Sequence, residues 1–104
     1  MTALMLTMTL DPERSEEVLR HIRVDVIPWV RRLPGFRSAR WIRSLDGSYC
    51  LVLVDFAEEE QAESVAELAR AQRDNPARSW NFDRIEVAEE LAVVSHPPRL
   101  TPSP

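Results

Sequence analysis

Residues 36–56 read FRSARWIRSLDGSYCLVLVDF, two strand-like stretches on either side of a turn. Asp46-Gly47 in the turn is the strongest short-range signal for a β-hairpin. The first stretch, residues 36–44, carries three arginines and is typical of a strand at the edge of a sheet. The second, residues 49–56, is apolar on both faces through its centre and is typical of a central strand.

Helical and strand-like patterns flank this hairpin on both sides. Residues 3–10 alternate without any charge, as a central strand does. Residues 12–33 place apolar side chains at spacings of three and four, which predicts a helix that Pro28 should kink or weaken. Residues 58–73 predict a second helix, and residues 82–94 predict a last strand. The order is therefore β-α-β-β-α-β.

This order predicts an α+β protein with the ferredoxin-like βαββαβ fold. Right-handed crossovers would place both helices on one face of a four-stranded antiparallel sheet, with strand order 4-1-3-2. We assign residues 1–94 to one domain and residues 95–104, which hold four prolines, to a C-terminal tail.

The sheet face away from the helices would have no cover within one chain. It would expose apolar side chains of both central strands, which is unusual on a soluble monomer. We therefore expect a homodimer in which the uncovered sheet faces pack together. A monomer whose tail folds over the sheet is the alternative, and the polar, proline-rich composition of that tail disfavours it.

Composition limits the classes of function. The net charge of −4 and the pI of about 5.2 disfavour a nucleic-acid partner, because phosphates would repel the chain overall. No apolar run approaches the roughly 18 residues that a membrane span needs. No signal-peptide pattern opens the chain, so no membrane partner and a cytoplasmic location are the default expectations.

Several catalytic and metal-binding classes are also disfavoured. Two distant histidines, His21 and His96, and one cysteine, Cys50, do not make a metal site. Cys50 lies within a strand pattern and is interpreted as a small buried apolar residue. The only glycines are Gly35 and Gly47, so a glycine-rich phosphate loop is absent.

Three features recur in one known family. They are Pro34-Gly35-Phe36 directly after an amphipathic helix, the strand 49–56, and the acidic start of the second helix at residues 58–60. With them the chain resembles the antibiotic biosynthesis monooxygenase domain of the dimeric α+β barrel superfamily, over about residues 3–94. The resemblance implies a dimeric α+β barrel and, in enzymatic members, a pocket between sheet and helices. Members include cofactor-independent oxygenases of polycyclic phenols and quinols, and haem-degrading enzymes.

The haem-degrading branch carries an Asn on the first strand, a Trp, and a His ligand on the second helix. This chain has no Asn in residues 3–10 and no His in residues 58–81, so it departs from that branch. We therefore expect no cofactor.

If the pocket is catalytic, we expect His21, Trp80 and Asn81 to be the catalytic residues. A structural histidine is the simpler interpretation of His21, and a base that removes a proton near neutral pH is the functional one. Trp80 and Asn81 are expected on a loop before the last strand, and loops carry sites more often than cores do.

Trp29, Trp41 and Thr7 are the expected substrate-binding residues. Packing in the core or at the dimer interface is the competing interpretation of both tryptophans. Thr7 depends on which face of its strand meets the helices. The edge-strand arginines could form a basic strip, although edge protection is the simpler interpretation: Arg37, Arg40 and Arg43.

The sequence thus predicts a cofactor-independent, monooxygenase-like protein that acts on a small aromatic substrate of the phenol or quinol type. The alternative is a non-catalytic small-molecule-binding or structural dimer of the same fold. A haem-binding or haem-degrading protein ranks third.

Overall fold

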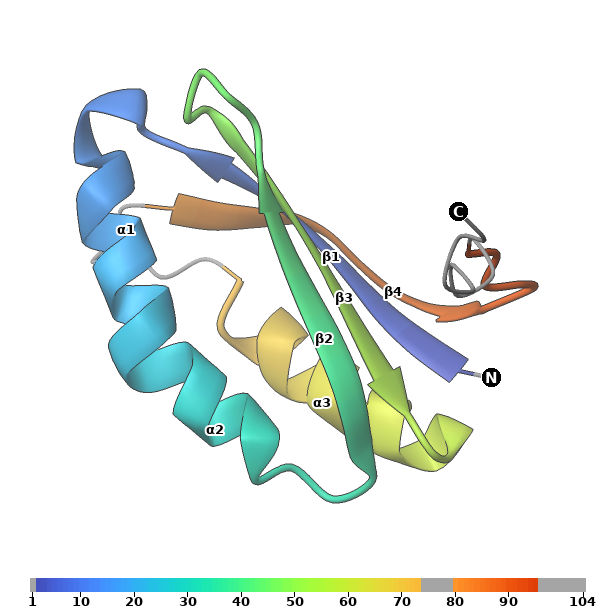
Figure 1. Ribbon diagram of the computed structural model, residues 1–104. Helices are drawn as coiled ribbons and strands as arrows, with labels where there is room; N and C mark the ends of the chain where they lie inside the picture. Colours follow the sequence, from blue (N-terminus) through green and yellow to red (C-terminus); the bar gives the residue numbers. More distant parts are fainter. Residues whose placement is uncertain (1, 74–79, 96–104) are drawn as a thin grey trace, which may run out of the picture.

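The computed structural model of the chain describes residues 2–73 and 80–95, and of Trp80 only the backbone. A four-stranded antiparallel sheet carries the helices on one face (Figure 1). The strand order is β2-β3-β1-β4, which is the predicted ferredoxin-like order. The strand bounds are β1 Thr2–Leu10, β2 Phe36–Arg43, β3 Tyr49–Phe56 and β4 Trp80–Glu89. The two strands with apolar centres, β1 and β3, lie in the middle and the arginine-rich strand lies at an edge, as predicted.

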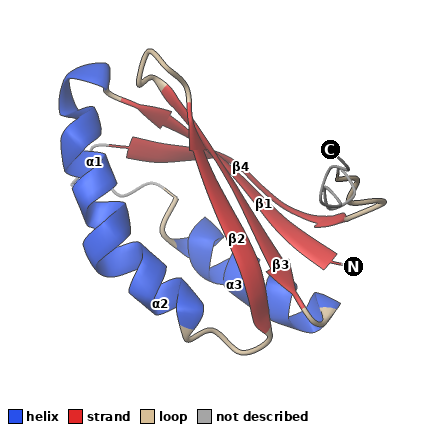
Figure 2. Cartoon of the chain, viewed as in Figure 1, coloured by secondary structure: helices blue, strands red, loops and turns tan. Residues whose placement is uncertain are grey.

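The core lies between the sheet and the helices (Figure 2). Side chains of a strand alternate between its two faces, so every second residue of β1 and β3 points toward the helices. Leu4 and Phe56 are fully buried there. The other buried core residues of these two strands are Leu6, Met8, Leu10, Cys50, Val52 and Val54.

The predicted helix of residues 12–33 is divided into segments of different winding. They are a 3-10 turn η1 (Pro12–Arg14), α1 (Ser15–His21), a π-helical turn η2 (Ile22–Val26) and α2 (Ile27–Arg31). The helix begins as predicted at Asp11, whose carboxylate accepts a hydrogen bond from the Glu13 N–H at 3.0 Å.

The sequence predicts a kink or a weakened backbone bond at Pro28, and the structure shows a π-helical turn before this residue. Pro28 has no N–H to donate to a carbonyl one turn earlier. Directly before it, the Ile27 N–H reaches the Ile22 carbonyl five residues back, which widens the turn. The helix therefore continues past the proline with a local change of winding.

The Pro34-Gly35-Phe36 junction is built around the start of α3 (Glu59–Ala71). A capping box joins Glu58 and Gln61, in which the Gln61 side-chain oxygen accepts from the Glu58 N–H at 3.0 Å. Gly35 lies beside this cap with φ of 76°, a conformation that favours glycine. A Cβ at Gly35 would overlap the Gln61 carboxamide, so the position needs glycine for two reasons.

The predicted Asp-Gly turn joins β2 and β3. Hydrogen bonds from the Ser48 hydroxyl, the Ser48 N–H and the Ser44 hydroxyl lower the pKa of Asp46 to about 2. Gly47 adopts φ of 77°, which is again a conformation suited to glycine.

The last strand differs from its predicted bounds at both ends. Trp80 and Asn81 belong to β4 and not to a preceding loop. At the other end β4 stops at Glu89, which pairs with Thr2 at the start of β1. Beyond Glu89 no β1 residue is left to pair with. Leu91 therefore lies exposed outside the strand, although the alternation of apolar and polar residues in the sequence continues past it.

An irregularity in β2 corrects the predicted assignment of faces. The pairing with β3 shifts between Phe36 and Ser38, which is the effect of a β-bulge. Phe36 consequently packs against the core together with Ala39 and Trp41, whereas strict alternation placed it with Ser38 and Arg40.

Two further expectations concern the limits of the chain. The predicted tail lies, except for Ser95, outside the described residues, as does His96. In the part of the chain that the structure describes, every helix is too short or too polar to cross a membrane.

We expect Gly35→Ala to lower the free energy of unfolding more than Gly47→Ala, although both glycines have nearly the same φ. A left-handed alanine costs about 1–2 kcal/mol at either position. Only at Gly35 does the new methyl group also disrupt the Gln61 cap, which adds about 0.5–2 kcal/mol. Urea unfolding followed by circular dichroism measures both losses.

Gln61→Ala provides the control for this explanation, because it removes the side chain that the methyl group would meet. The double variant Gly35→Ala/Gln61→Ala should lose less stability than the sum of the two single variants. Strictly additive losses would contradict the role given to the cap.

Candidate functional site

A cavity of about 650 Å³ lies between the helices and the sheet. The helix-facing sides of β1 and β3 line it from below, and α1, η2, α2 and α3 line it from the other side. Its volume falls within the range of small-molecule sites. Most of its lining is aliphatic, and five side chains supply aromatic or polar character: His21, Trp29, Trp41, Gln72 and Phe82.

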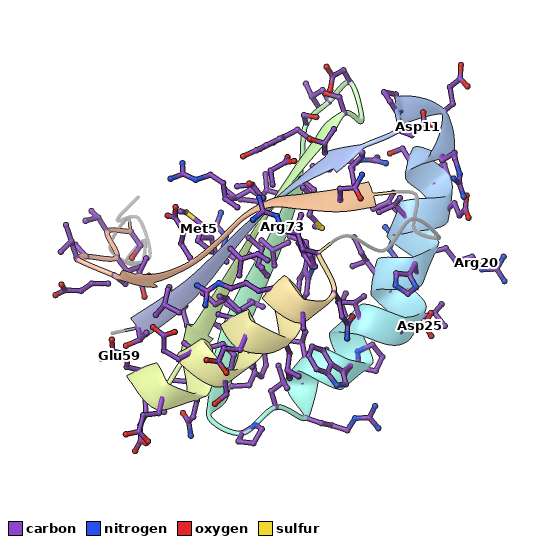
Figure 3. All side chains as sticks on the ribbon, turned by 180° about the vertical axis from the view of Figure 1, so that it is seen from behind. Met5, Asp11, Arg20, Asp25, Glu59 and Arg73 are labelled. Atoms are coloured by element: carbon purple, nitrogen blue, oxygen red, sulfur yellow. The ribbon has the colours of Figure 1, made fainter. Side chains whose placement is uncertain are left out.

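His21, the last residue of α1, is the titratable group in this lining. Its ring Nδ1 lies 3.0 Å from the Asp25 carboxylate, and the two side chains are 45% and 63% exposed. Figure 3 shows Asp25 on the outer side of the helical layer, so His21 bridges the carboxylate and the cavity. A carboxylate at Nδ1 favours the tautomer protonated on Nδ1 and leaves Nε2 as the basic nitrogen.

Sequence reasoning found His21 and missed Asp25. The signal was present, because residues four apart on a helix are neighbours on its surface. The exposed pair contributes little to stability. Its effect on the orientation and tautomer of the imidazole is therefore the more important one for chemistry.

Both tryptophans expected to bind substrate line the large cavity. Trp41 is half-buried on β2, whereas Trp29 on α2 is 44% exposed. Together with His21 they are the sequence-predicted site residues that the structure brings together.

The other predicted site residues do not line this cavity. Thr7 pairs with Leu51 of β3 and with Arg84 of β4, on the face of the sheet away from the helices. Asn81 pairs with Thr9 on that same face and is exposed. Trp80 pairs with Leu10 through its backbone. The site roles of Thr7, Trp80 and Asn81 stay predictions.

A second, smaller cavity of about 200 Å³ adjoins the first, and Ile22 and Trp41 line both. Its polar lining consists of Ser15, Arg23 and Arg43. The Arg43 guanidinium donates a hydrogen bond to the Ser15 hydroxyl at 2.6 Å. The Glu16 carboxylate lies 3.6 Å from the same guanidinium.

The buried thiol of Cys50 also lines the small cavity, and burial raises its pKa. A thiol with a raised pKa is a poor nucleophile, which agrees with its interpretation as an apolar residue. Among the described residues, no group of three or more His, Cys, Asp or Glu side chains could hold a metal ion. The large, mostly aliphatic cavity can accept an apolar ring, and His21 in its lining is a group that can transfer a proton.

The predicted basic strip on β2 is divided between the two faces of the sheet. Arg43 pairs with Cys50 on the helix side, whereas Arg40 pairs with Leu53 on the open side. Alternation along the strand explains the separation, because the two arginines are three residues apart.

A ferredoxin-like sheet with helices on one face and an apolar cavity between them defines an α+β protein with a small-molecule-sized pocket. Solved structures share this fold. The monooxygenase from the gene ActVA-Orf6 of Streptomyces coelicolor, in complex with nanaomycin D, is 20% identical with a TM-score of 0.56, over 90% of this chain and 92% of that one. The haem degrader MhuD of Mycobacterium tuberculosis, with two haems bound, is 14% identical with a TM-score of 0.69, over 91% and 100%.

A candidate antibiotic biosynthesis monooxygenase from Deinococcus radiodurans is also similar, at 14% identity and a TM-score of 0.61, over 92% of this chain and 98% of that one. Neither a protein-family model nor a curated protein matches the sequence. At such identities the likeness shows the fold. It confirms the ferredoxin-like α+β fold that the resemblance to the antibiotic biosynthesis monooxygenase domain implies for the single chain, and the dimeric barrel stays a prediction.

We expect Ala69→Phe to weaken the binding of a neutral apolar probe, N-phenyl-1-naphthylamine, about tenfold or more. Ala69 lies on α3 and lines the large cavity, so the added ring would occupy the space of the probe. Fluorescence titration measures the affinity, and circular dichroism verifies that the variant is folded.

The matched control is Ala71→Phe, at the exposed end of the same helix and outside the cavity lining. It adds the same group and should leave the affinity unchanged. Equal weakening by both variants, or none by either, would show that the probe binds elsewhere.

Proposed function

We propose that the protein is a cofactor-independent monooxygenase-like enzyme that acts on a small aromatic substrate of the phenol or quinol type. The observation that carries this proposal is His21 in the lining of a large apolar cavity, with the Asp25 carboxylate at its Nδ1. The cavity provides the binding energy and the histidine provides the base.

The shape and chemistry of the cavity suit a planar aromatic ring. Trp41 and Trp29 offer aromatic faces, and the aliphatic lining replaces water around the ring. The ActVA-Orf6 monooxygenase, which has the same fold, holds nanaomycin D in its structure. That likeness supports an aromatic ligand for this chain.

The chemistry begins with removal of the phenol proton by Nε2 of His21. Asp25 stabilises the resulting imidazolium, as a carboxylate does when it accepts a hydrogen bond from the other ring nitrogen. The phenolate is rich in electrons and reduces dioxygen. One oxygen atom forms a C–O bond at a ring carbon that loses its hydrogen, and the other leaves as water, so the phenol is oxidised to a quinone.

We expect His21→Gln to lower the rate of oxygen uptake with a phenol or quinol substrate by about 10²-fold or more, because the base is lost. Asp25→Asn should have a smaller effect, about tenfold, since it removes the partner at Nδ1 and keeps the imidazole. An oxygen electrode measures the rates.

Glu17→Gln is the matched control, on the same helix and outside the cavity lining. It should leave the rate unchanged. Undiminished uptake in His21→Gln would refute the role of this base. A folded wild-type protein that binds aromatic probes and consumes no oxygen with any of them would instead support the non-catalytic binding alternative, and a Soret shift on titration with haem would support the haem-binding one.

We also propose that two copies of the chain pair through the open face of the sheet. Met5 lies opposite Leu53, and Ile42 opposite Leu51, so apolar side chains adjoin across three strands on this face. Ile42 is 41% exposed in the single chain. Such a patch favours association.

Charges at the margins of this face are compatible with self-association. Arg40 lies on β2 at one side, and the Arg84–Glu86 ion pair lies on β4 at the other. Positive and negative side chains are both present on this face. A two-fold symmetric contact can therefore place opposite charges near each other.

We expect the wild-type chain to sediment at twice its mass of 12.0 kDa. Leu53→Arg should weaken the dimer about tenfold or more, because it places a charge in the apolar patch. Leu45→Arg, at a fully exposed turn position, is the control and should leave the dimer intact. A wild-type chain that stays monomeric at high concentration would contradict the proposed pairing.

A further inference from the structure

We propose that the small cavity beside the large one is an anion subsite, and that the aromatic ligand of this protein therefore carries a carboxylate. This inference rests on the proposed function in one respect, because it places the aromatic ring of the ligand in the large cavity. It adds the class of substrate, an aromatic carboxylic acid.

Two arginines from different elements are among the residues that line the small cavity. Arg23 comes from the π-helical turn η2, and Arg43 is the last residue of β2. The hydroxyl of Ser15, a residue that is only 7% exposed, completes the polar lining. Planar guanidinium groups bind carboxylates through paired hydrogen bonds, so the donors present match that class of anion.

The structural roles of these groups leave most of their donors available. A guanidinium has five N–H donors, and Arg43 uses one of them in the hydrogen bond to Ser15. Arg23 makes no hydrogen bond or ion pair with any other described residue. Arg23 is an exposed residue, so its donors are accessible to a ligand.

Glu16 is the carboxylate nearest to Arg43, and its position favours the proposal. Its oxygen lies 3.6 Å from the guanidinium, beyond hydrogen-bond distance, and its side chain is 88% exposed. Solvent screens such a contact, so Glu16 neutralises the cavity only weakly. A ligand carboxylate held between two arginines would replace it.

The two cavities are arranged for one ligand. Trp41 and Ile22 line both, so a ring that stacks on Trp41 in the large cavity has its edge near the small one. The small cavity, at about 200 Å³, is below the usual size of a complete small-molecule site. It is large enough for the polar substituent of a ring that is bound in the large cavity.

The test compares 2-naphthoate with its neutral isostere 2-naphthamide by isothermal titration calorimetry. Wild-type protein should bind the acid about tenfold or more tightly than the amide. Arg23→Met and Arg43→Met should each remove most of that preference and leave the affinity for the amide within about twofold. Glu16→Gln should strengthen binding of the acid only slightly, because the carboxylate that it removes is exposed and screened by solvent.

Two considerations make the result specific. Arg43→Met also loses the bond to Ser15 and could unfold, so Arg23→Met carries the test independently. Arg20→Met removes the same charge from α1, at an exposed position that lines neither cavity, and should change neither affinity. Arg20→Met could instead weaken acid binding as much as Arg23→Met does. That result would show that the preference for the acid comes from the overall positive charge nearby and not from the small cavity, and it would overturn the subsite.

Equal affinity of the wild-type protein for acid and amide would also overturn the anion subsite. So would a preference for the acid that survives both arginine substitutions. In either case binding of the amide would leave the large cavity standing as the ligand site of the proposed function. If neither probe binds, the subsite and the proposed function fail together.

Discussion

The pairing of β1 with both of its neighbours is the constraint on which the rest of the structure depends. β1 pairs with β3 from Thr2 to Thr9 and with β4 from Thr2 to Leu10, where the register shifts between Thr7 and Met8. Because strand side chains alternate, this register turns Leu4, Leu6 and Met8 toward the helices. A slip by one residue would move the whole apolar set to the open face and abolish the cavity.

The fold could be predicted because its determinants are local. The Asp-Gly turn, the two strands without charged centres and the helical periodicity each act over a few residues, and their order leaves little freedom of topology. The end of β4 and the bulge at Phe36 could not be predicted, since both depend on the strand alongside. The π-helical turn was foreseen only as a disturbance, because Pro28 indicates where a helix changes and not how.

The candidate site divides in the same way. His21, Trp29 and Trp41 could be identified from the sequence because they are scarce residue types near apolar stripes, and the structure brings them together. Thr7 could not be assigned, because periodicity does not say which face of β1 meets the helices. Arg23 and Arg43 are twenty positions apart, and only the packing of α1 and η2 against the end of the hairpin places them in one cavity.

The π-helical turn links these observations. It lies between His21 and Pro28, so the missing proline N–H is accommodated where the helix passes over both cavities. Ile22 at its start lines both cavities, Arg23 lines the small one and Val26 lines the large one. A widened turn changes the angle between successive side chains around the helix axis. Residues close in sequence can therefore line two different cavities. Pro28 thus interrupts the regular winding of the helix, and the short segment before it contributes side chains both to the large cavity and to the small cavity that Arg23 and Arg43 line.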